Sequence, residues 1–164
     1  MKIRNAAMYD INEITAVESA CFPEAEAATR EEFEKRLAHY ADCFWLMTDD
    51  KGRIISFVDG MATDRRDLTD EMYENAALHD PNGRWQMIFG VNTLPEYRRR
   101  GYAEALLRRV AIDAKNRGRS GLVLTCKERL IHYYAKLGFV NEGLSRSTHG
   151  DAVWYQMRLT FEKQ

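Results

Sequence analysis

The sequence has few residues that form disulfides or break secondary structure: its 164 residues include three cysteines and three prolines. Cys21, Cys43 and Cys126 are odd in number, widely spaced and without a CxxC pair. This excludes a disulfide-stapled scaffold and favours the reduced thiols of a cytosolic setting. No repeat, low-complexity tract or Pro/Gly-rich linker divides the chain. We therefore expect a single domain over residues 1–164.

An excess of one charge and long apolar runs are also missing. The 24 Lys and Arg residues face 25 Asp and Glu, and this balance argues against a general polyanion binder. No stretch approaches the roughly 20 apolar residues of a membrane span, and no hydrophobic region follows Met1–Asn5 as in a secretory signal. With 45% apolar and 11% aromatic residues the chain can pack a core. We expect a soluble, cytoplasmic globular protein.

Strand and helix periods alternate along the chain, which predicts an α/β (α+β) fold. Asp10 is a candidate N-cap, Thr29 and Glu32 match a capping box, and Gly90 inside an apolar run indicates a bulge or close backbone approach. The predicted elements of the first half are a strand at Lys2–Asn5, a helix at Asp10–Phe22, a loop at Pro23–Ala28, a helix from Thr29 to about His39, a hairpin of Cys43–Thr48 and Ile54–Ala62, a short helix at Thr69–Leu78 and a strand at Trp85–Val91.

The second half has a tighter order. Its predicted elements are a long helix at Tyr102–Arg117, a strand at Leu122–Thr125, a helix at Glu128–Leu137, a strand at Phe139–Glu142 and a last hairpin that turns near His149–Asp151 into Val153–Leu159. This order predicts a layered mixed sheet. The polar segment Thr63–Arg84 is too long for a simple turn between strands, and connections of that length are usually functional.

The segment from Val91 to Ala103 carries the clearest chemical signal. It reads as a strand, a turn with Pro95, the basic run Arg98-Arg99-Arg100 and a helix start of small residues. The first N–H groups of a helix are unpaired and lie at the positive end of its dipole, so they suit a phosphate. Gly101 and Ala103 leave room for a pyrophosphate there, and the arginines add positive charge.

Two other interpretations of this segment remain open. It could be a solvated turn ahead of an ordinary helix. Alternatively, Arg108 and Arg109 extend the basic surface toward a nucleic-acid site. The acidic remainder of the chain and the lack of aromatic residues between these arginines weaken the nucleic-acid interpretation.

A second signal follows in the segment Ile131–Phe139. It places Tyr133 and Tyr134 at the end of a helix, ahead of Gly138. A tyrosine hydroxyl at such a junction could donate a proton, although a core aromatic with its hydroxyl at the edge is the commoner case.

Together the two segments resemble the GNAT superfamily of acetyl-coenzyme A-dependent N-acetyltransferases. The phosphate motif of that superfamily, Arg/Gln-x-x-Gly-x-Gly/Ala, matches Arg98–Ala103. Its Tyr-x-Lys-x-Gly-Phe pattern matches Tyr134–Phe139. The resemblance implies a mixed, mostly antiparallel central sheet flanked by helices on both faces, with acetyl-CoA as co-substrate and no metal.

The resemblance also implies a role for each matching residue. The backbone of Val91 and Thr93 would pair with the pantetheine amides, and Gly90 would free an N–H for the thioester carbonyl. Tyr134 would be the catalytic acid that protonates the CoA thiolate. The residues expected to bind the cofactor are Val91, Asn92, Thr93, Arg98, Arg99, Arg100, Gly101, Tyr102, Ala103, Glu104 and Lys136.

Within the superfamily, the insert at Leu68–Met72 and Leu78–Gly83 and the run Leu124–Lys127 resemble the arylalkylamine (serotonin) N-acetyltransferase-like branch. That branch carries two histidines on the cofactor strand, where this chain has Met87 and Phe89. A histidine relay is therefore absent here.

The general base is left open by the sequence. An alkylamine with a pKa of about 10 is almost fully protonated at pH 7, so a group must take its proton. Cys126 has no His–carboxylate partner beside it, which favours a small buried residue over an acetyl-enzyme nucleophile. The candidate bases are Asp59, Glu24, Glu26, His79 and His149. Candidates for an apolar amine pocket, each more often a core residue, are Trp45, Phe57, Met61, Met72, Trp85, Met87 and Phe89.

These observations favour acetyl transfer to a primary amine, with an arylalkylamine-like acceptor, by direct attack in a ternary complex. A peptide, protein or polyamine acceptor and a non-catalytic acetyl-CoA sensor are the alternatives. The resemblance leaves a homodimer open, and we expect neither a nucleic-acid nor a membrane partner.

Overall fold

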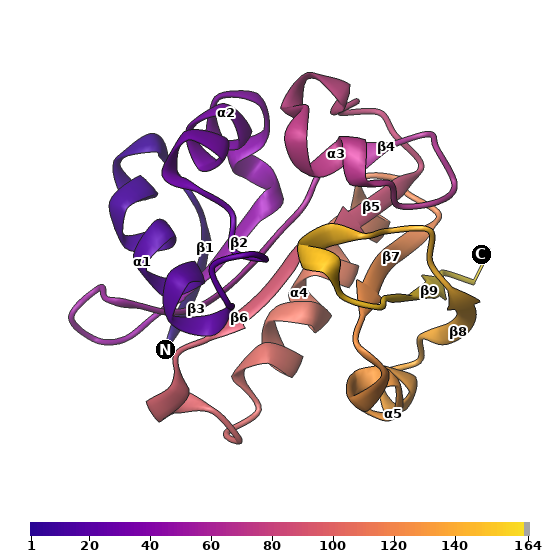
Figure 1. Cartoon of the computed structure of the whole chain (residues 1–164). Helices are drawn as coiled ribbons and strands as arrows, with labels where there is room; N and C mark the ends of the chain where they lie inside the picture. The colour runs from indigo at the N-terminus through magenta and orange to yellow at the C-terminus, as the bar shows by residue number, and fades with distance from the viewer. Residues whose placement is uncertain (163–164) are drawn as a thin grey trace. The chain divides into compact units, whose positions relative to one another are not determined.

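The computed structural model describes residues 1–162, which form two compact units (Figure 1). The first unit contains Met1–Gly60 and Gly90–Val110, and the second contains Met61–Phe89 and the chain from Ala111 onward. Each sheet lies within one unit. Among the described residues, no helix is long and apolar enough to cross a membrane.

The first unit is built on an antiparallel sheet in the order β1-β2-β3-β6. Its elements are β1 (Lys2–Asn5), the short 3-10 helix η1 (Met8–Asp10), α1 (Ile11–Cys21), α2 (Arg30–Tyr40), η2 (Ala41–Cys43), β2 (Phe44–Thr48), β3 (Ile54–Asp59), β6 (Gly90–Thr93) and η4 (Pro95–Tyr97). The predicted capping box is confirmed, because Thr29 Oγ1 accepts the Glu32 N–H and Glu32 Oε1 accepts the Thr29 N–H.

Aromatic side chains fill the core between these helices and the sheet. Phe33 of α2 meets Phe44 and Phe57 edge-on, with ring centroids 6.1 Å apart in both pairs. All three side chains are fully buried. Because Phe44 and Phe57 stand on neighbouring strands, this contact fixes α2 on one face of the sheet.

Two local predictions for this unit are wrong in detail. Asp10 precedes α1 but makes no capping bond to it; its carboxylate accepts the Ala7 N–H and pairs with Arg4 at 2.8 Å. The Asp10 carboxylate therefore binds Arg4 and the Ala7 N–H and not the N-terminus of α1. The apolar run Ile54–Ala62 is not one strand, because β3 ends at Asp59 and Ala62 starts β4 of the other sheet.

The second unit contains a mixed sheet in the order β4-β5-β7-β9-β8. Within the described residues 1–162, only β5 and β7 of this sheet run parallel, and its other pairs are antiparallel. Its elements are β4 (Ala62–Thr63), α3 (Asp70–Glu74), η3 (Ala76–Leu78), β5 (Trp85–Ile88), β7 (Gly121–Cys126), η5 (Glu128–Leu130), α5 (Ile131–Lys136), β8 (Val140–Leu144), η6 (His149–Asp151) and β9 (Tyr155–Thr160). The predicted mixed, mostly antiparallel α/β fold is confirmed.

Two predicted elements are interrupted in the structure. The strand predicted at Trp85–Val91 breaks at Phe89, so that β5 ends at Ile88 and β6 continues to Thr93. The helix predicted at Thr69–Leu78 divides at Asn75, whose side chain accepts the Ala77 N–H and starts η3. The long helix α4 (Tyr102–Asn116) contributes residues to both units and is followed by Gly118, where φ is +79°.

Candidate active site

Strand β6 is the edge of the first sheet within residues 1–162. The Leu94 N–H donates to Ile55 C=O of β3 at 2.9 Å. The N–H and C=O groups of Gly90 and Asn92, the other even-numbered residues of this strand, therefore also point toward β3. Since backbone direction alternates along a strand, the N–H and C=O groups of Val91 and Thr93 face the open edge. The Thr93 carbonyl accepts Arg98 Nε at 3.0 Å and the Cys21 thiol at 3.3 Å there.

The chain after β6 makes an exposed basic loop. Arg99 and Gly101 both have positive φ, +63° and +80°, so two residues of this short loop are in the left-handed region. A Cβ at Gly101 would meet no protein atom within 4 Å. Glycine is favoured here for its backbone conformation, and it leaves the space ahead of α4 open.

Helix α4 begins directly after this loop. Its first i→i−4 bond runs from the Ala105 N–H to Gly101 C=O, so the N–H groups of residues 102–104 precede the helical ladder. Arg98, Arg99 and Arg100 are exposed, and no carboxylate of residues 1–162 forms an ion pair with them. The loop and the helix start are together electropositive, and we call them the candidate anion site.

A group of buried polar side chains lies behind the start of β6. A Cβ placed on Gly90 would lie 3.0 Å from Asn92 Nδ2, 3.3 Å from Asp59 Oδ1 and 3.4 Å from Glu18 Oε1. Arg36 of α2 pairs with the other oxygen of Asp59 at 3.1 Å. The exposed fractions of these four side chains do not exceed 5%. We call Glu18, Arg36, Asp59 and Asn92 the Gly90 cluster.

The Gly90 cluster contains two carboxyl groups and one guanidinium. Glu18 Oε2 accepts the Ala28 N–H at 2.9 Å and holds the loop between α1 and α2, whereas Glu18 Oε1 makes no hydrogen bond in the described structure. Burial, and then the nearby Asp59 carboxylate, raise the pKa of Glu18 to about 7. Burial also raises the pKa of Asp59, against the effect of Arg36.

Two candidate residues of the second unit lie on α5. Tyr134 is buried and packs edge-on against Phe139, with ring centroids 5.8 Å apart, whereas Lys136 is exposed. Burial raises the pKa of Tyr134, so its hydroxyl keeps its proton at neutral pH. Burial also raises the pKa of Cys126 to about 11, and its thiol donates to Met157 Sδ. A protonated, buried thiol is a poor nucleophile, in agreement with its interpretation as a packing residue.

Aromatic rings of the second unit gather beside the strand break. Tyr73 of α3 lies 4.7 Å from the Phe89 ring and stacks on the His149 imidazole at 4.8 Å, centroid to centroid. Trp154 continues the group 6.1 Å from His149, with the Lys127 ammonium over its ring. Phe89, His149 and Trp154 are half-buried. We call Tyr73, Phe89, His149 and Trp154 the aromatic group.

The structure shows where the remaining candidates for the amine pocket and the general base lie. Phe89 belongs to the aromatic group, and Trp85 lies under the Arg158 guanidinium at 4.4 Å. Five of the residues considered for an amine pocket are core residues, at most 1% exposed: Trp45, Phe57, Met61, Met72 and Met87. Among the candidate bases, Glu24 is exposed, Glu26 is half-buried, His149 is stacked and Asp59 is ion-paired.

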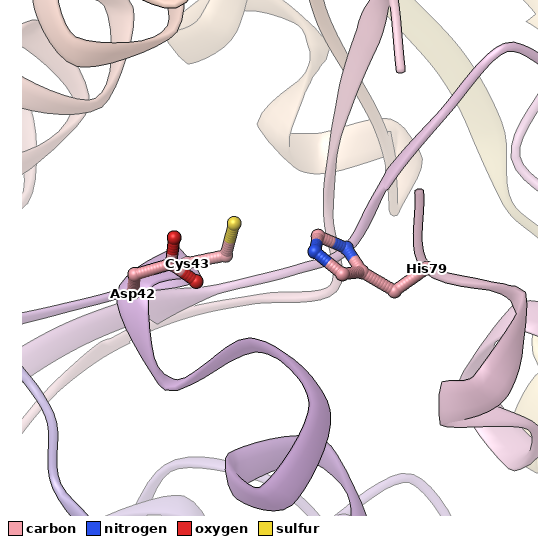
Figure 2. A group of neighbouring side chains, drawn as sticks. All are labelled: Asp42, Cys43 and His79. Atoms are coloured by element: carbon pink, nitrogen blue, oxygen red, sulfur yellow. The ribbon is translucent and has the colours of Figure 1, made fainter. Parts of the chain in front are cut away.

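Figure 2 shows Asp42 and Cys43 on η2 and His79 after η3. The first two residues belong to the first unit and His79 to the second. Within its own unit, His79 Nδ1 accepts the Ala62 N–H at 3.0 Å. This contact gives the imidazole a role in fixing the start of β4.

The sequence missed Glu18, Arg36 and Tyr73, although a signal existed for the two charged residues. Glu18 stands seven residues after Ile11 and four after Ile14, on the apolar face of α1. Arg36 stands between Phe33 and Tyr40 on the apolar face of α2. Opposite charges on the buried faces of successive helices indicate a buried polar group.

The comparison with protein families agrees with this geometry. Residues 8–139 match the family described as the acetyltransferase (GNAT) family. That match covers most of the chain, and the protein therefore belongs to the GNAT acetyltransferases. No curated protein is significantly similar to the sequence.

Solved structures share the fold at low sequence identity. The GphF GNAT-like decarboxylase in complex with isobutyryl-CoA has a TM-score of 0.83 and 19% identity, over 98% of this chain and 99% of that one. The loading GNATL domain of CurA from Lyngbya majuscula has a TM-score of 0.83 and 16% identity, over 97% and 96%. The ribosomal-protein-S18-alanine N-acetyltransferase from Escherichia coli has a TM-score of 0.74 and 18% identity, over 99% and 95%.

Proposed function

We propose that the protein transfers the acetyl group of acetyl-CoA to a primary amine, and that the acceptor is arylalkylamine-like. The observation that carries the donor half is the candidate anion site at the start of α4, directly after an open strand edge. This one segment of the first unit contains ten of the eleven residues predicted for the cofactor, all except Lys136.

The cofactor uses this segment in two ways. Its pyrophosphate takes hydrogen bonds from the N–H groups of residues 102–104 and charge from Arg99 and Arg100. Its pantetheine arm pairs with the open backbone of Val91 and with the Thr93 N–H as an added strand would, since the Thr93 carbonyl already accepts Arg98 Nε and the Cys21 thiol. Asn92 differs from its neighbours, because its side chain is fully buried and its C=O accepts Ser56 Oγ at 2.6 Å.

The aromatic group supports an aromatic acceptor. Phe89 directly precedes Gly90, the first residue of β6, and lies two residues before Val91, whose N–H faces the open edge. Aromatic pairs contribute about 0.5–1.5 kcal/mol beyond the area they bury, enough to distinguish an arylalkylamine from a polyamine.

The transfer itself proceeds by direct attack of the amine on the thioester. The nitrogen must lose a proton before it attacks, and the sulfur leaves as a thiolate. Tyr134 is the proposed acid for that sulfur, since its buried hydroxyl stays protonated at neutral pH. Because a thiol has a pKa near 8.5, the thiolate leaves readily and this acid adds modestly to the rate.

The variant Tyr134→Phe tests that role. We expect kcat to fall about tenfold, with acetyl-CoA affinity changed less than twofold, because only the hydroxyl is lost. Tyr133→Phe is the matched control, because Tyr133 is the preceding residue and is exposed. Steady-state kinetics and calorimetric titration give both quantities. An equal kcat for the two variants across pH would make Tyr134 a packing residue.

The acceptor is tested with a panel of amines, measured as CoA release together with mass spectrometry of the product. The panel contains tryptamine, phenethylamine, spermidine and a peptide with a free N-terminus. We expect N-acetylated tryptamine or phenethylamine. Acetylation of spermidine or peptide alone would overturn the acceptor class. Tight acetyl-CoA binding without turnover of any amine would overturn the enzyme and favour a sensor.

A further inference from the structure

The Gly90 cluster is the largest group of buried charge in the first unit that the proposed donor site leaves unused. Its carboxylate oxygens Glu18 Oε1 and Asp59 Oδ1 both lie within 3.4 Å of a Cβ position on Gly90. Neither oxygen has a hydrogen-bond partner in the described structure. A buried polar atom without a partner is costly, so its retention at this position calls for a reason.

The charges in the cluster do not balance when both carboxyls are ionised. Arg36 pairs directly with Asp59, which leaves Glu18 as the group that gains and loses the proton. The groups that face Glu18 are Asp59 from β3, Arg36 from α2, Cys21 from its own helix and the Asn92 amide from β6. Since Gly90 has no side chain, no Cβ lies between these oxygens and the backbone of β6, along which the acetyl-CoA arm is proposed to bind.

We propose that Glu18, coupled to Asp59, accepts the proton of the acceptor amine. This inference rests on the proposed acetyl transfer along β6 and names the base that the sequence left open. It gives the cluster a reason to keep two carboxyls where one would neutralise Arg36. Glu18 Oε2 stays on the Ala28 N–H throughout, so Glu18 Oε1 is the reacting atom.

The step balances as follows. An N–H bond of the substrate ammonium breaks, and its proton forms an O–H bond with Glu18 Oε1. The electron pair left on nitrogen attacks the thioester carbonyl carbon, and the C–S bond breaks with its pair on sulfur. The nitrogen releases its second proton to solvent, the Tyr134 hydroxyl gives its proton to the sulfur, and Tyr134 regains a proton from solvent. Glu18 then releases its proton to solvent.

The test compares Glu18→Gln with Glu13→Gln in the full-length protein. Glu13 lies on the same helix and accepts a backbone N–H, that of Ile54 at 2.8 Å, outside the cluster. Glutamine keeps an acceptor oxygen for either bond and removes the titratable group. The quantities measured are kcat from pH 5.5 to 9 and acetyl-CoA affinity, with the best amine of the panel.

In the wild type we expect kcat to rise with pH through a midpoint near 7, where Glu18 loses its proton. Glu18→Gln should lower the high-pH plateau of kcat at least tenfold and remove the rising limb of the pH profile, with acetyl-CoA affinity unchanged. Glu13→Gln should keep both plateau and limb. A Glu18→Gln profile that matches the wild type would overturn the inference, whereas a wild type without turnover would overturn the proposed function instead.

A second measurement does not depend on the folding of the variant. Carbon-13 NMR of labelled glutamate carboxyls in the wild type follows the titration of Glu18 directly. A midpoint that matches the kcat limb supports the inference. A midpoint below pH 5 would overturn it, because the carboxyl would then be ionised across the whole active range and could not produce the limb.

Discussion

Gly101→Glu should weaken acetyl-CoA binding at least 100-fold while the protein stays folded. The substitution puts a carboxylate where the pyrophosphate is proposed to lie, directly ahead of the N–H groups that start α4. The new side chain meets no protein atom, since a Cβ at Gly101 has nothing within 4 Å. The positive φ of +80° adds a backbone cost of about 1 kcal/mol.

Gly118→Glu is the matched control for this variant. Gly118 follows the other end of α4, with φ of +79° and open space around its Cβ position. Both variants therefore add the same charge and a similar strain to one helix, but only Gly101 adjoins the candidate anion site. Calorimetric titration with acetyl-CoA measures the difference. Equal affinity in the two variants would remove the phosphate site from this loop.

Arg36→Met should destabilise the protein by about 3–5 kcal/mol, the cost of leaving a buried charge without its partner. Arg36 and Asp59 are 3% and 1% exposed and pair at 3.1 Å. Without the guanidinium, burial raises the pKa of Asp59 further above its unfolded value. The loss of stability should therefore be smallest below the unfolded pKa of Asp59, about 4, where the carboxyl is protonated in both states, and grow as the pH rises.

Arg30→Met is the control on the same helix. Arg30 forms an exposed i,i+4 pair with Glu34 at 3.6 Å, and such pairs contribute at most about 1 kcal/mol. Urea unfolding at pH 4.5 and pH 8 compares the two variants. If Arg36→Met costs no more than Arg30→Met at pH 8, the Gly90 cluster is not a tight buried network.

Two helix N-termini could be predicted from the sequence because their signals depend on local chemistry. The capping box of Thr29 and Glu32 and the glycine at the start of α4 each depend on residues within one turn. Asp10 shows the limit of that reasoning, because its carboxylate satisfied the Arg4 guanidinium in place of the α1 N-terminus. A cap and an ion pair use the same atoms, and sequence spacing does not rank them.

The parts of the site that depend on long-range packing were not predictable in this way. Tyr73, Phe89 and His149 meet although they are far apart in the sequence, and only the fold brings their rings together. Glu18 and Arg36 were visible as charges on apolar helix faces, but only the packing of α1 and α2 on the sheet brings both of them near Asp59 of β3. Neither the acceptor surface nor the proton acceptor could be found from spacing alone.

Amide hydrogen exchange with and without acetyl-CoA tests the central claim most directly, because it reads the backbone groups that are proposed to hold the cofactor. We expect slower exchange at Val91, Thr93 and residues 102–104, and little change along the shielded pairs of β1 and β2. Protection confined to other segments, or saturating acetyl-CoA without any protection in residues 91–104, would contradict the account.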